Sequence, residues 1–346
     1  MAVLAIVTSS PPNVEGGHLV IARSLVNAAR EVGHDAHLVV TRDYGFGRTS
    51  QSYLGNWRAD VRSVEARKVD QVISLRYPSY AVRHPAHVCW LNHTMREYYD
   101  LWSEFSSTIS SRARVKENVR KVAIRAADWW LLHFNVTSVV AQSHTIQRRL
   151  ANDLAVRAEV LWPPAPQRAY RCEGYGEYIF VASRLTAHKR IDLAIRALAE
   201  PGAGNVRLVI AGEGERQSPL EALVRQLGID GRVRFVGRAD DAAVLDHLAR
   251  CRAVCFPPFG EDYGFVTVEA FSSRKPVVTC RDSGGPTELV HDGDTGLICE
   301  PTPRSLAAAF ARVMDDRELA ERMGGRAAAL AATMSWSEAV ERLVIV

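Results

Sequence analysis

Two glutamates in one short stretch of the chain have the chemistry to hold polar groups of a ligand. Glu261 and Glu269 stand on either side of Gly264 in "FPPFGEDYGFVTVEAF". Carboxylates accept hydrogen bonds from neighbouring hydroxyls, and free backbone amides at a helix start attract anions such as phosphate. The stretch could therefore grip one ligand that carries both groups. The alternative is that Glu261 caps a loop and Glu269 is a solvated helix residue.

The order of elements around the two glutamates is that of a strand, a loop and a helix. The apolar run "AVCF" predicts a strand, which places Glu261 in the loop at the strand's carboxyl end. A helix is predicted from Phe265 onward, so the amides of Gly264, Phe265 and Val266 would lie at its start. Glu269 would then lie about one turn inside the helix.

Two cations follow another predicted strand in the same half of the chain. In "VASRLTAHKRIDLAI", a strand over 178–182 precedes Arg184 and Lys189, and a helix begins near Ile191. A basic pair beside a helix start suits a diphosphate. A solvated loop is the alternative.

A doubled glycine precedes the first predicted helix. Gly16 and Gly17 stand in "SSPPNVEGGHLVIARSL", which is not the dinucleotide-binding pattern G-x-G-x-x-G. Adjacent glycines would let the backbone approach a bulky ligand closely. A tight turn explains them equally well.

These stretches belong to two halves in which short apolar runs alternate with amphipathic ones. This alternation predicts an α/β protein with two doubly wound, Rossmann-like domains and parallel sheets. We expect an N-terminal domain over 1–163, a second over 164–335, and a helix in 336–346 that packs back towards the first. The proline-rich segment 160–172 is the predicted connection, and a long Ala-rich helix is predicted from Ser305. Because ligands bind at the carboxyl ends of parallel strands, we expect the site in a cleft between the domains.

The composition is that of an ordinary globular protein. Of 346 residues, 47% are apolar and 24% are charged, and the net charge of +4 is too weak to indicate a nucleic-acid partner. No apolar stretch is long enough to span a bilayer. The opening "MAVLAIVTSSPP" has no basic segment before its apolar run, so a secretory signal is not expected. The six scattered cysteines do not complete a zinc site, and we expect a cytoplasmic protein with reduced thiols.

Taken together, these stretches resemble retaining glycosyltransferases of family 4, which have the GT-B fold. The resemblance rests on "EGG", "GHDAHLV", "ASRLTAHKRID", "VRLVIAGEGE", "VRFVG", "EDYGFVTVEAF", "SGGPTELVHDGDTGLI" and "MSWSEAVERL", which follow the family's order over nearly the whole chain. The spacing from Glu261 to Glu269 matches the family's E-x7-E element.

The resemblance implies roles for the matching residues. Arg184 and Lys189 would bind the diphosphate of a nucleotide-sugar donor. Glu261 would contact hydroxyls of the transferred sugar, and Glu269 would hold the ribose. His93 in "CWLNHT" would point at the sugar from the N-terminal domain, although it could instead be a packed histidine. Further donor contacts would come from Gly16 and Gly17, from the backbone near Arg238, and from the backbone at Tyr263, Gly264, Phe265 and Val266.

The activity implied by the resemblance is transfer of a sugar, with retention of configuration, from a nucleotide-diphosphate sugar to an acceptor hydroxyl. The acceptor could be a surface polysaccharide, a lipid-linked glycan or a natural-product scaffold. No cofactor and no metal are expected, and Asp292 and Asp294 in "HDGDTG" are interpreted as a glycine turn. The alternatives are another GT-B enzyme, such as an epimerase or a phosphorylase, and a non-catalytic nucleotide-sugar-binding subunit. The donor base, the sugar, the acceptor and the oligomeric state stay open.

The segment 112–126, "RARVKENVRKVAIRA", predicts a basic amphipathic helix. Val115, Val119, Val122 and Ala126 recur at helical spacing among six basic residues and one acidic residue. One interpretation is a solvated helix docked on its own domain. The other is contact with anionic lipid at the inner face of a membrane, or with an anionic acceptor.

Overall fold

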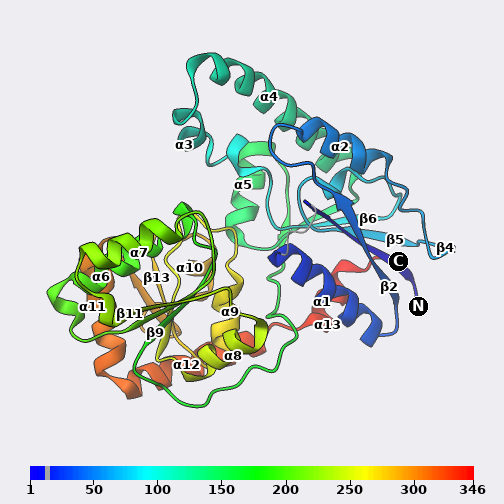
Figure 1. The fold of residues 1–346 in the computed structure, drawn as a ribbon. Coiled ribbons are helices and arrows are strands. Elements are labelled where there is room, and N and C mark those ends of the chain that lie inside the picture. The colour runs from blue at the N-terminus through cyan, green and yellow to red at the C-terminus, as the bar shows by residue number, and fades with distance from the viewer. Residues whose placement is uncertain (12–15) are drawn as a thin grey trace. The chain divides into compact units, whose positions relative to one another are not determined.

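The fold was analysed in a computed structural model that describes residues 1–11 and 16–346. The chain forms two compact units, which are coloured along the sequence in Figure 1. Unit 1 comprises Met1–Pro166 together with Ser335–Val346, and unit 2 comprises Gln167–Met334. Each unit is built on one parallel sheet with helices, which confirms the predicted α/β class.

The sheet of unit 1 has the strand order β2-β1-β5-β6-β7-β8, and all of its neighbouring strands are parallel. Three of its short apolar strands lie in the stretches "DQVISL", "HVCWLNH" and "SVVAQS", which fit the predicted alternation. A small antiparallel hairpin, β3 with β4, stands apart from this sheet. The strands are β1 (Val3–Ser10), β2 (Asp35–Arg42), β3 (Ser63–Val64), β4 (Arg67–Lys68), β5 (Gln71–Ser74), β6 (His87–Leu91), β7 (Ser138–Ala141) and β8 (Glu159–Val160).

Side chains that alternate along β6 show the two faces of this sheet. Cys89 and Leu91 lie in a buried cluster that includes residues of α4 and α5. Trp90, between them, points the other way and packs edge-on against Trp336 of α13, with ring centroids 6.1 Å apart. The helical elements of unit 1 are α1 (Gly17–Glu31), α2 (Thr49–Arg58), η1 (Ser79–Ala81), η2 (Arg96–Tyr98), α3 (Trp102–Ser107), α4 (Ser111–Trp130), η3 (Leu131–Asn135), α5 (His144–Leu154) and α13 (Trp336–Leu343).

The last helix of the chain, α13, packs on unit 1 and lies beside α1 (Figure 1). The indole nitrogen of Trp336 donates to the carbonyl of Ala165 at 2.8 Å. Gln71 at the start of β5 donates to the carbonyl of Leu343 at 2.7 Å and accepts from the amide of Ile345 at 2.8 Å. A buried side-chain amide of the sheet thus fastens the end of the chain.

The sheet of unit 2 has the order β11-β10-β9-β12-β13-β14, again with parallel neighbours. Ile179 and Val181 of β9 lie in the core cluster that α6, α7 and α11 share. Phe180, between them, stacks on His247 of α8 at a centroid distance of 5.0 Å. The strands are β9 (Ile179–Ala182), β10 (Leu208–Ala211), β11 (Val233–Gly237), β12 (Ala253–Cys255), β13 (Val277–Cys280) and β14 (Gly296–Cys299).

The helices of unit 2 follow the predicted alternation, with one correction. The prediction of a single long helix from Ser305 is wrong, because one helix ends at Asp315 and another begins at Arg317. The Asp316 carboxylate accepts from the amide of Leu319 at 2.8 Å and so starts a new helix, as a favourable N-cap residue does. The helical elements are η4 (Ala187–Lys189), α6 (Ile191–Ala199), η5 (Pro201–Ala203), α7 (Gln217–Gln226), η6 (Asp230–Arg232), α8 (Asp241–Arg250), α9 (Phe265–Ser272), α10 (Pro286–Leu289), α11 (Pro303–Asp315) and α12 (Arg317–Ala332).

Each sheet has a point at which the strand order reverses direction. In unit 2 this point lies between β9 and β12, and in unit 1 it lies between β1 and β5. Open parallel sheets bind ligands at the carboxyl ends of the strands beside such a point, because the loops there diverge to opposite faces. The loops that leave these four strands are therefore the first places to look for a site.

Candidate active site

Two predicted site residues of unit 2 meet at the reversal point of its sheet. Lys189, from the loop after β9, lies 2.5 Å from a carboxylate oxygen of Glu261, from the loop after β12. The ammonium group also lies over the ring of Phe256, 5.3 Å from its centroid. The side chains of Lys189 and Glu261 are each only partly exposed. A cation and a carboxylate thus share one partly desolvated position at the strand ends.

Arg190 braces the loops around this pair, a role that the sequence did not suggest. Its guanidinium group forms two bonds to the Asp282 carboxylate, at 2.7 and 2.8 Å. The same group donates to the carbonyls of Pro257 and Pro258, each at 2.8 Å. The planar guanidinium group therefore links the loop after β12 to the loop after β13. Sequence analysis passed over Arg190 because it stands in a run of cations with nothing to distinguish it.

The loop that carries Glu261 packs directly against the backbone of Gly284 and Gly285. The amide of Gly285 donates to the carbonyl of Glu261 at 2.8 Å. A Cβ added to Gly284, which has φ +73°, would meet that same carbonyl oxygen at 2.4 Å. A Cβ on Gly264, with φ +85°, would meet the ring of Phe256 at 2.6 Å. Gly264 and Gly284 are therefore required both by their positive φ and by the close packing.

Glu269 lies inside unit 2 with partners that were not predicted. Its carboxylate accepts from Arg168 at 2.6 Å and from the hydroxyl of Tyr170 at 3.2 Å, and its side chain is 12% exposed. The alternative of a solvated helix residue is therefore wrong. Burial raises the pKa of Glu269 above its ordinary value, and the nearby positive charge of Arg168 opposes that shift. Arg168 also pairs with Asp241, at the start of α8, at 2.8 Å.

Sequence analysis missed Arg168 and Tyr170 because both lie in the proline-rich stretch that it assigned to the connection. That stretch has no periodicity and follows no predicted strand, so no local signal points to Glu269 about a hundred residues further on. The two glutamates are consequently held apart by different cations. Glu261 faces Lys189, and Glu269 faces Arg168.

The other predicted residues of unit 2 occupy loops and the start of α9. Gly264 is the N-cap residue of α9, and Phe265 and Val266 form its first turn, where amides lack intrahelical acceptors. Tyr263 is buried, and its ring packs edge-on against Phe265 at 5.2 Å. The side chain of Arg184 is exposed in the loop after β9, and that of Arg238 is exposed in the loop after β11.

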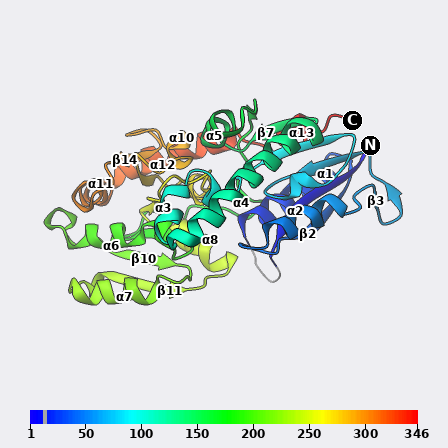
Figure 2. The ribbon, with the colours of Figure 1, turned by 90° about the horizontal axis from the view of Figure 1, so that it is seen from above.

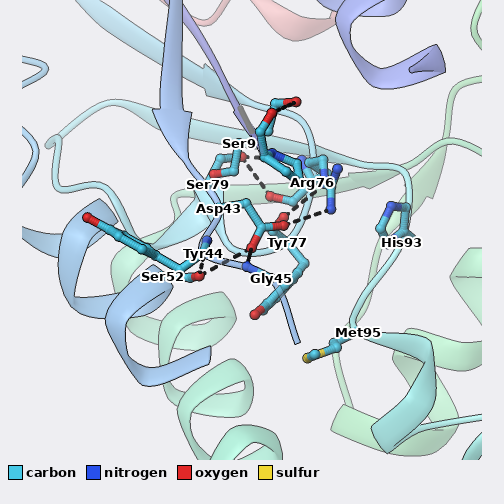
Figure 3. Close-up of polar contacts among 12 residues, drawn as sticks. Ser9, Asp43, Tyr44, Gly45, Ser52, Arg76, Tyr77, Ser79, His93 and Met95 are labelled. Atoms are coloured by element: carbon cyan, nitrogen blue, oxygen red, sulfur yellow. Dashed lines mark hydrogen bonds and ion pairs between the residues drawn. The ribbon is translucent and has the colours of Figure 1, made fainter. Parts of the chain in front are cut away.

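A buried polar group lies at the reversal point of unit 1 (Figure 3). Asp43, just after β2, accepts from the amide of Gly45 at 2.9 Å and from the hydroxyl of Ser52 at 3.2 Å. Arg76, after β5, reaches the same carboxylate at 3.3 Å. Burial raises the pKa of Tyr77, the next residue, and the negative charge of Asp43 adds to that shift. The Asp43 carboxylate thus pairs with the Arg76 cation inside unit 1.

His93 and the glycine pair belong to the same end of the unit 1 sheet. His93 follows β6, and its Nδ1 lies 2.8 Å from the carbonyl of Thr94. Its own carbonyl accepts from the amide of Tyr77 at 3.3 Å, which links the loops after β5 and β6 (Figure 3). Gly16 is the extended N-cap residue of α1 and Gly17 is the helix's first residue. Glu15 of the "EGG" string lies outside the described residues.

The D-x-D string lies in a turn before β14. Asp292 accepts from the amide of Ile298 at 2.9 Å, and Asp294 pairs with Arg326 at 2.6 Å. Gly293, between them, has φ +75°. Over residues 1–11 and 16–346, no group of three or more His, Cys, Asp or Glu side chains is placed to hold a metal ion. Within the same ranges no helix combines the length and apolarity that crossing a membrane requires.

Comparison with solved structures defines the fold. A crystal structure of HepE from Anabaena in complex with UDP and glucose has a TM-score of 0.72, with 18% identity, and covers 98% of this chain and 97% of that one. Sucrose-phosphate synthase from Thermosynechococcus elongatus has a TM-score of 0.76, with 16% identity, and covers 98% and 96%. The chain therefore has the GT-B fold of two Rossmann-like domains, as predicted.

Sequence comparison links the second half of the chain to sugar transfer. Residues 170–329 match the family "Glycosyl transferases group 1". The α-D-kanosaminyltransferase of Streptomyces kanamyceticus is 33% identical over 186 residues, which cover 51% of this chain and 48% of that protein. The chain thus spans about half the length of this curated relative. Segment 170–329, which matches the family, contains Lys189, Glu261 and Glu269.

Proposed function

We propose that this protein is a retaining glycosyltransferase of family 4 that uses a nucleotide-diphosphate sugar. The observation that carries the proposal is the meeting of Lys189 and Glu261 beside the start of α9, at the reversal point of the unit 2 sheet. One cation, one carboxylate and the free amides of a helix start suit a phosphate that carries a sugar. The match of residues 170–329 to group 1 glycosyl transferases supports the same conclusion.

In this proposal each predicted site residue of unit 2 binds one part of the donor. Lys189 and Arg184 bind the diphosphate, with the amides of Gly264, Phe265 and Val266. Glu261 accepts hydroxyls of the transferred sugar once Lys189 turns to the phosphate. The backbone at Tyr263 joins these amides in cradling the sugar and the phosphate. Glu269, held by Arg168, accepts the ribose hydroxyls, and the backbone at Arg238 meets the base.

The bond that breaks joins the anomeric carbon of the sugar to an oxygen of the β-phosphate. Negative charge then develops on that phosphate, where Lys189, Arg184 and the amides of the first turn of α9 stabilise it. The acceptor hydroxyl attaches to the anomeric carbon on the face that the phosphate leaves. Its proton passes to the departing phosphate oxygen. Because these cations serve the leaving group, we propose that transfer requires no metal and no further cofactor.

The remaining proposals rest on the resemblance and the comparisons. The roles of His93, Gly16 and Gly17 in donor or sugar contact stay predictions. The acceptor class stays a glycan, a lipid-linked glycan or a natural-product scaffold, and the proposed location is the cytoplasm. Since HepE of Anabaena was crystallised with UDP and glucose, UDP-sugars are the first donors to test.

The experiment measures donor binding and donor turnover separately. A thermal-shift screen with UDP-, GDP-, ADP- and dTDP-sugars should find one donor that raises the unfolding temperature, since a ligand at 100 times its Kd adds about 2.7 kcal/mol of stability. With that donor, release of the nucleoside diphosphate and NMR of the first sugar anomer formed report turnover and retention. Binding without release would mean a non-catalytic subunit, and an inverted anomer would end the retaining assignment.

A matched pair of variants locates the chemistry. Glu261→Gln should lower turnover by about a hundredfold, because the amide no longer offers two acceptor oxygens to the sugar. Glu300→Gln removes the same charge from an exposed pair with Arg281 and should leave turnover unchanged. Equal rates for the two variants would remove Glu261 from the site.

A further inference from the structure

Helix α4 of unit 1 carries an apolar stripe that faces away from the core of that unit. Val115, Val119 and Val122 are 67%, 68% and 70% exposed, and Trp129 and Phe134 continue the row at 42% and 66%. Steps of four, three, seven and five residues place these side chains along one side of α4 and the turn of helix after it. A row of this length on the surface of a helix is unusual, since single exposed apolar residues are the norm.

The opposite side of α4 docks firmly on unit 1. Asp128, with no exposed surface, accepts hydrogen bonds from the hydroxyls of Tyr53, Tyr80 and Tyr99. One turn earlier Ile124 is buried in the core of the unit. The helix is therefore docked on its own domain, as one interpretation held, but not by its valines. Its orientation is set by Asp128, and that orientation turns the valines outward.

Contacts at both ends of the helix fix the same rotation. Near its start, Glu117 accepts from the hydroxyl of Tyr98 at 2.7 Å and pairs with Arg120 at 2.6 Å. Near its end, Trp130 contacts Trp57 of α2 at a centroid distance of 5.6 Å. Figure 2 shows α4 running beside α2. The exposed stripe is thus a property of a fixed helix face.

The exposed charged residues of α4 itself are all cations. The two acidic residues of α4, Glu117 and Asp128, lie on the docked side, with side chains 10% exposed or less. Lys121 lies over the ring of Trp102, and Arg125 lies over that of Tyr99 and pairs with Asp153 of α5 at 2.7 Å, so both cations stand beside the docked face. The basic residues of the helix are Arg112, Arg114, Lys116, Arg120, Lys121 and Arg125. An apolar row bordered by cations complements an anionic lipid surface.

A basic groove adjoins the aromatic end of the stripe. Phe134 forms part of a cavity of about 380 Å³ that Arg62, Arg83 and His84 also line. Arg83 lies over the ring of Trp57, 5.0 Å from its centroid. Tryptophans and arginines side by side are typical of the interface between lipid headgroups and acyl chains. The apolar row therefore ends at a second group of cations.

We propose that the exposed face of α4 binds the surface of a bilayer that contains anionic phospholipids. The stripe of Val115, Val119, Val122, Trp129 and Phe134 enters the acyl boundary, and the flanking cations meet the headgroup phosphates. The helix lies along the surface, because its other side is occupied by unit 1 and cannot enter lipid. This inference does not depend on the proposed sugar transfer.

The test is flotation of the full chain with vesicles of defined composition. The wild-type protein should float with phosphatidylcholine vesicles that contain 30% phosphatidylglycerol and stay in the bottom fraction with pure phosphatidylcholine. Raising the salt to about 0.5 M should lower the floated fraction, because screening weakens the electrostatic part of binding. Replacing Val115, Val119 and Val122 together by serine should lower partitioning by at least about tenfold, since three apolar side chains no longer enter lipid.

Two matched variants serve as controls. Val32→Ser and Val346→Ser make the same change at other exposed valines of unit 1, which are 48% and 57% exposed, and should float like the wild type. All variants should keep the wild-type unfolding temperature, because the substituted side chains are exposed. Failure of the wild type to float with anionic vesicles, or equal flotation of the triple variant, overturns the proposal. Loss of a wild-type dimer in the triple variant, without any flotation, would assign the stripe to a second copy of the chain and also overturn it.

Discussion

Unit 1 and unit 2 both enclose carboxylates, but they hold them with different kinds of partner. In unit 1, three tyrosine hydroxyls from separate elements converge on Asp128. In unit 2, Glu261 meets the single ammonium group of Lys189. Rigid rings packed in a core cannot leave their acceptor, whereas a lysine on a flexible stem can turn to a ligand phosphate. A carboxylate held by three rings of the core fixes a helix in place, whereas in the proposed function a carboxylate paired with one lysine can exchange that partner for a ligand.

Glu269 of unit 2 stands between these two cases. It is nearly as buried as Asp128, yet its main partner is the long side chain of Arg168, which also reaches Asp241. A planar guanidinium group that bridges two acids is more restrained than a lysine but less so than a tyrosine in a core. The three carboxylates therefore differ in how much the loss of a partner should lower the free energy of unfolding.

The largest effect on stability is expected at the fastening of unit 1. Asp128→Ala should lower the free energy of unfolding by about 3–5 kcal/mol, since three buried hydroxyls lose their acceptor. Asp128→Asn keeps one acceptor oxygen and should cost less than half as much. Urea unfolding at pH 7 measures both. A loss under 1 kcal/mol for the alanine variant would mean that the tyrosines do not fasten α4.

A smaller loss is expected at the intermediate carboxylate of unit 2. Arg168→Ala should cost about 2–4 kcal/mol, because it leaves the buried Glu269 charge without its cation. Adding Glu269→Gln to the same chain should restore part of that stability, since the unpaired charge is then gone. If the double variant is less stable than Arg168→Ala by a further 1 kcal/mol or more, the pair does not act as a pair.

The pH dependence of stability should report on the buried carboxylate of Asp128 in unit 1. Burial raises the pKa of Asp128 to about 6, above its ordinary value of 3.8. The native state thus holds the proton more tightly than the unfolded state. The stability from this group is therefore complete below about pH 4 and is lost as the pH rises through 6, by roughly 2–3 kcal/mol. The difference in unfolding free energy between wild type and Asp128→Asn, measured from pH 4 to 7.5, should follow this course; a constant difference would contradict it.

The smallest effect is expected where a carboxylate pair is on the surface. Arg281 and Glu300 lie 2.8 Å apart with both side chains more than half exposed. Solvent screens such a pair, so Arg281→Ala should change the free energy of unfolding by no more than about 0.5 kcal/mol. Chemical denaturation beside Arg168→Ala provides the contrast. A loss of stability as large as that of Arg168→Ala would show that the distance between the paired charges, and not their burial, determines the size of the effect.

Much of the active-site proposal could be predicted because its signals are local. A strand end, a glycine that must take positive φ and a helix start follow one another between Glu261 and Glu269, and each depends on neighbours in sequence. The same is true of the loop that carries Lys189. The break at Asp316 was missed because a helix-capping aspartate within an alanine-rich run gives a weaker signal than the run itself.

By itself the sequence determined the alternation of strands and helices, the two Rossmann-like halves and the loops that carry Lys189, Glu261 and Glu269. Only the tertiary structure decided which groups these side chains meet. It paired Lys189 with Glu261 across 72 residues and Arg168 with Glu269 across 101 residues. It also turned the valines of α4 outward, because the tyrosines around Asp128 fix that helix from the other side. Local order follows from backbone geometry and apolar periodicity, whereas partners distant in sequence are chosen by packing, which no short stretch encodes.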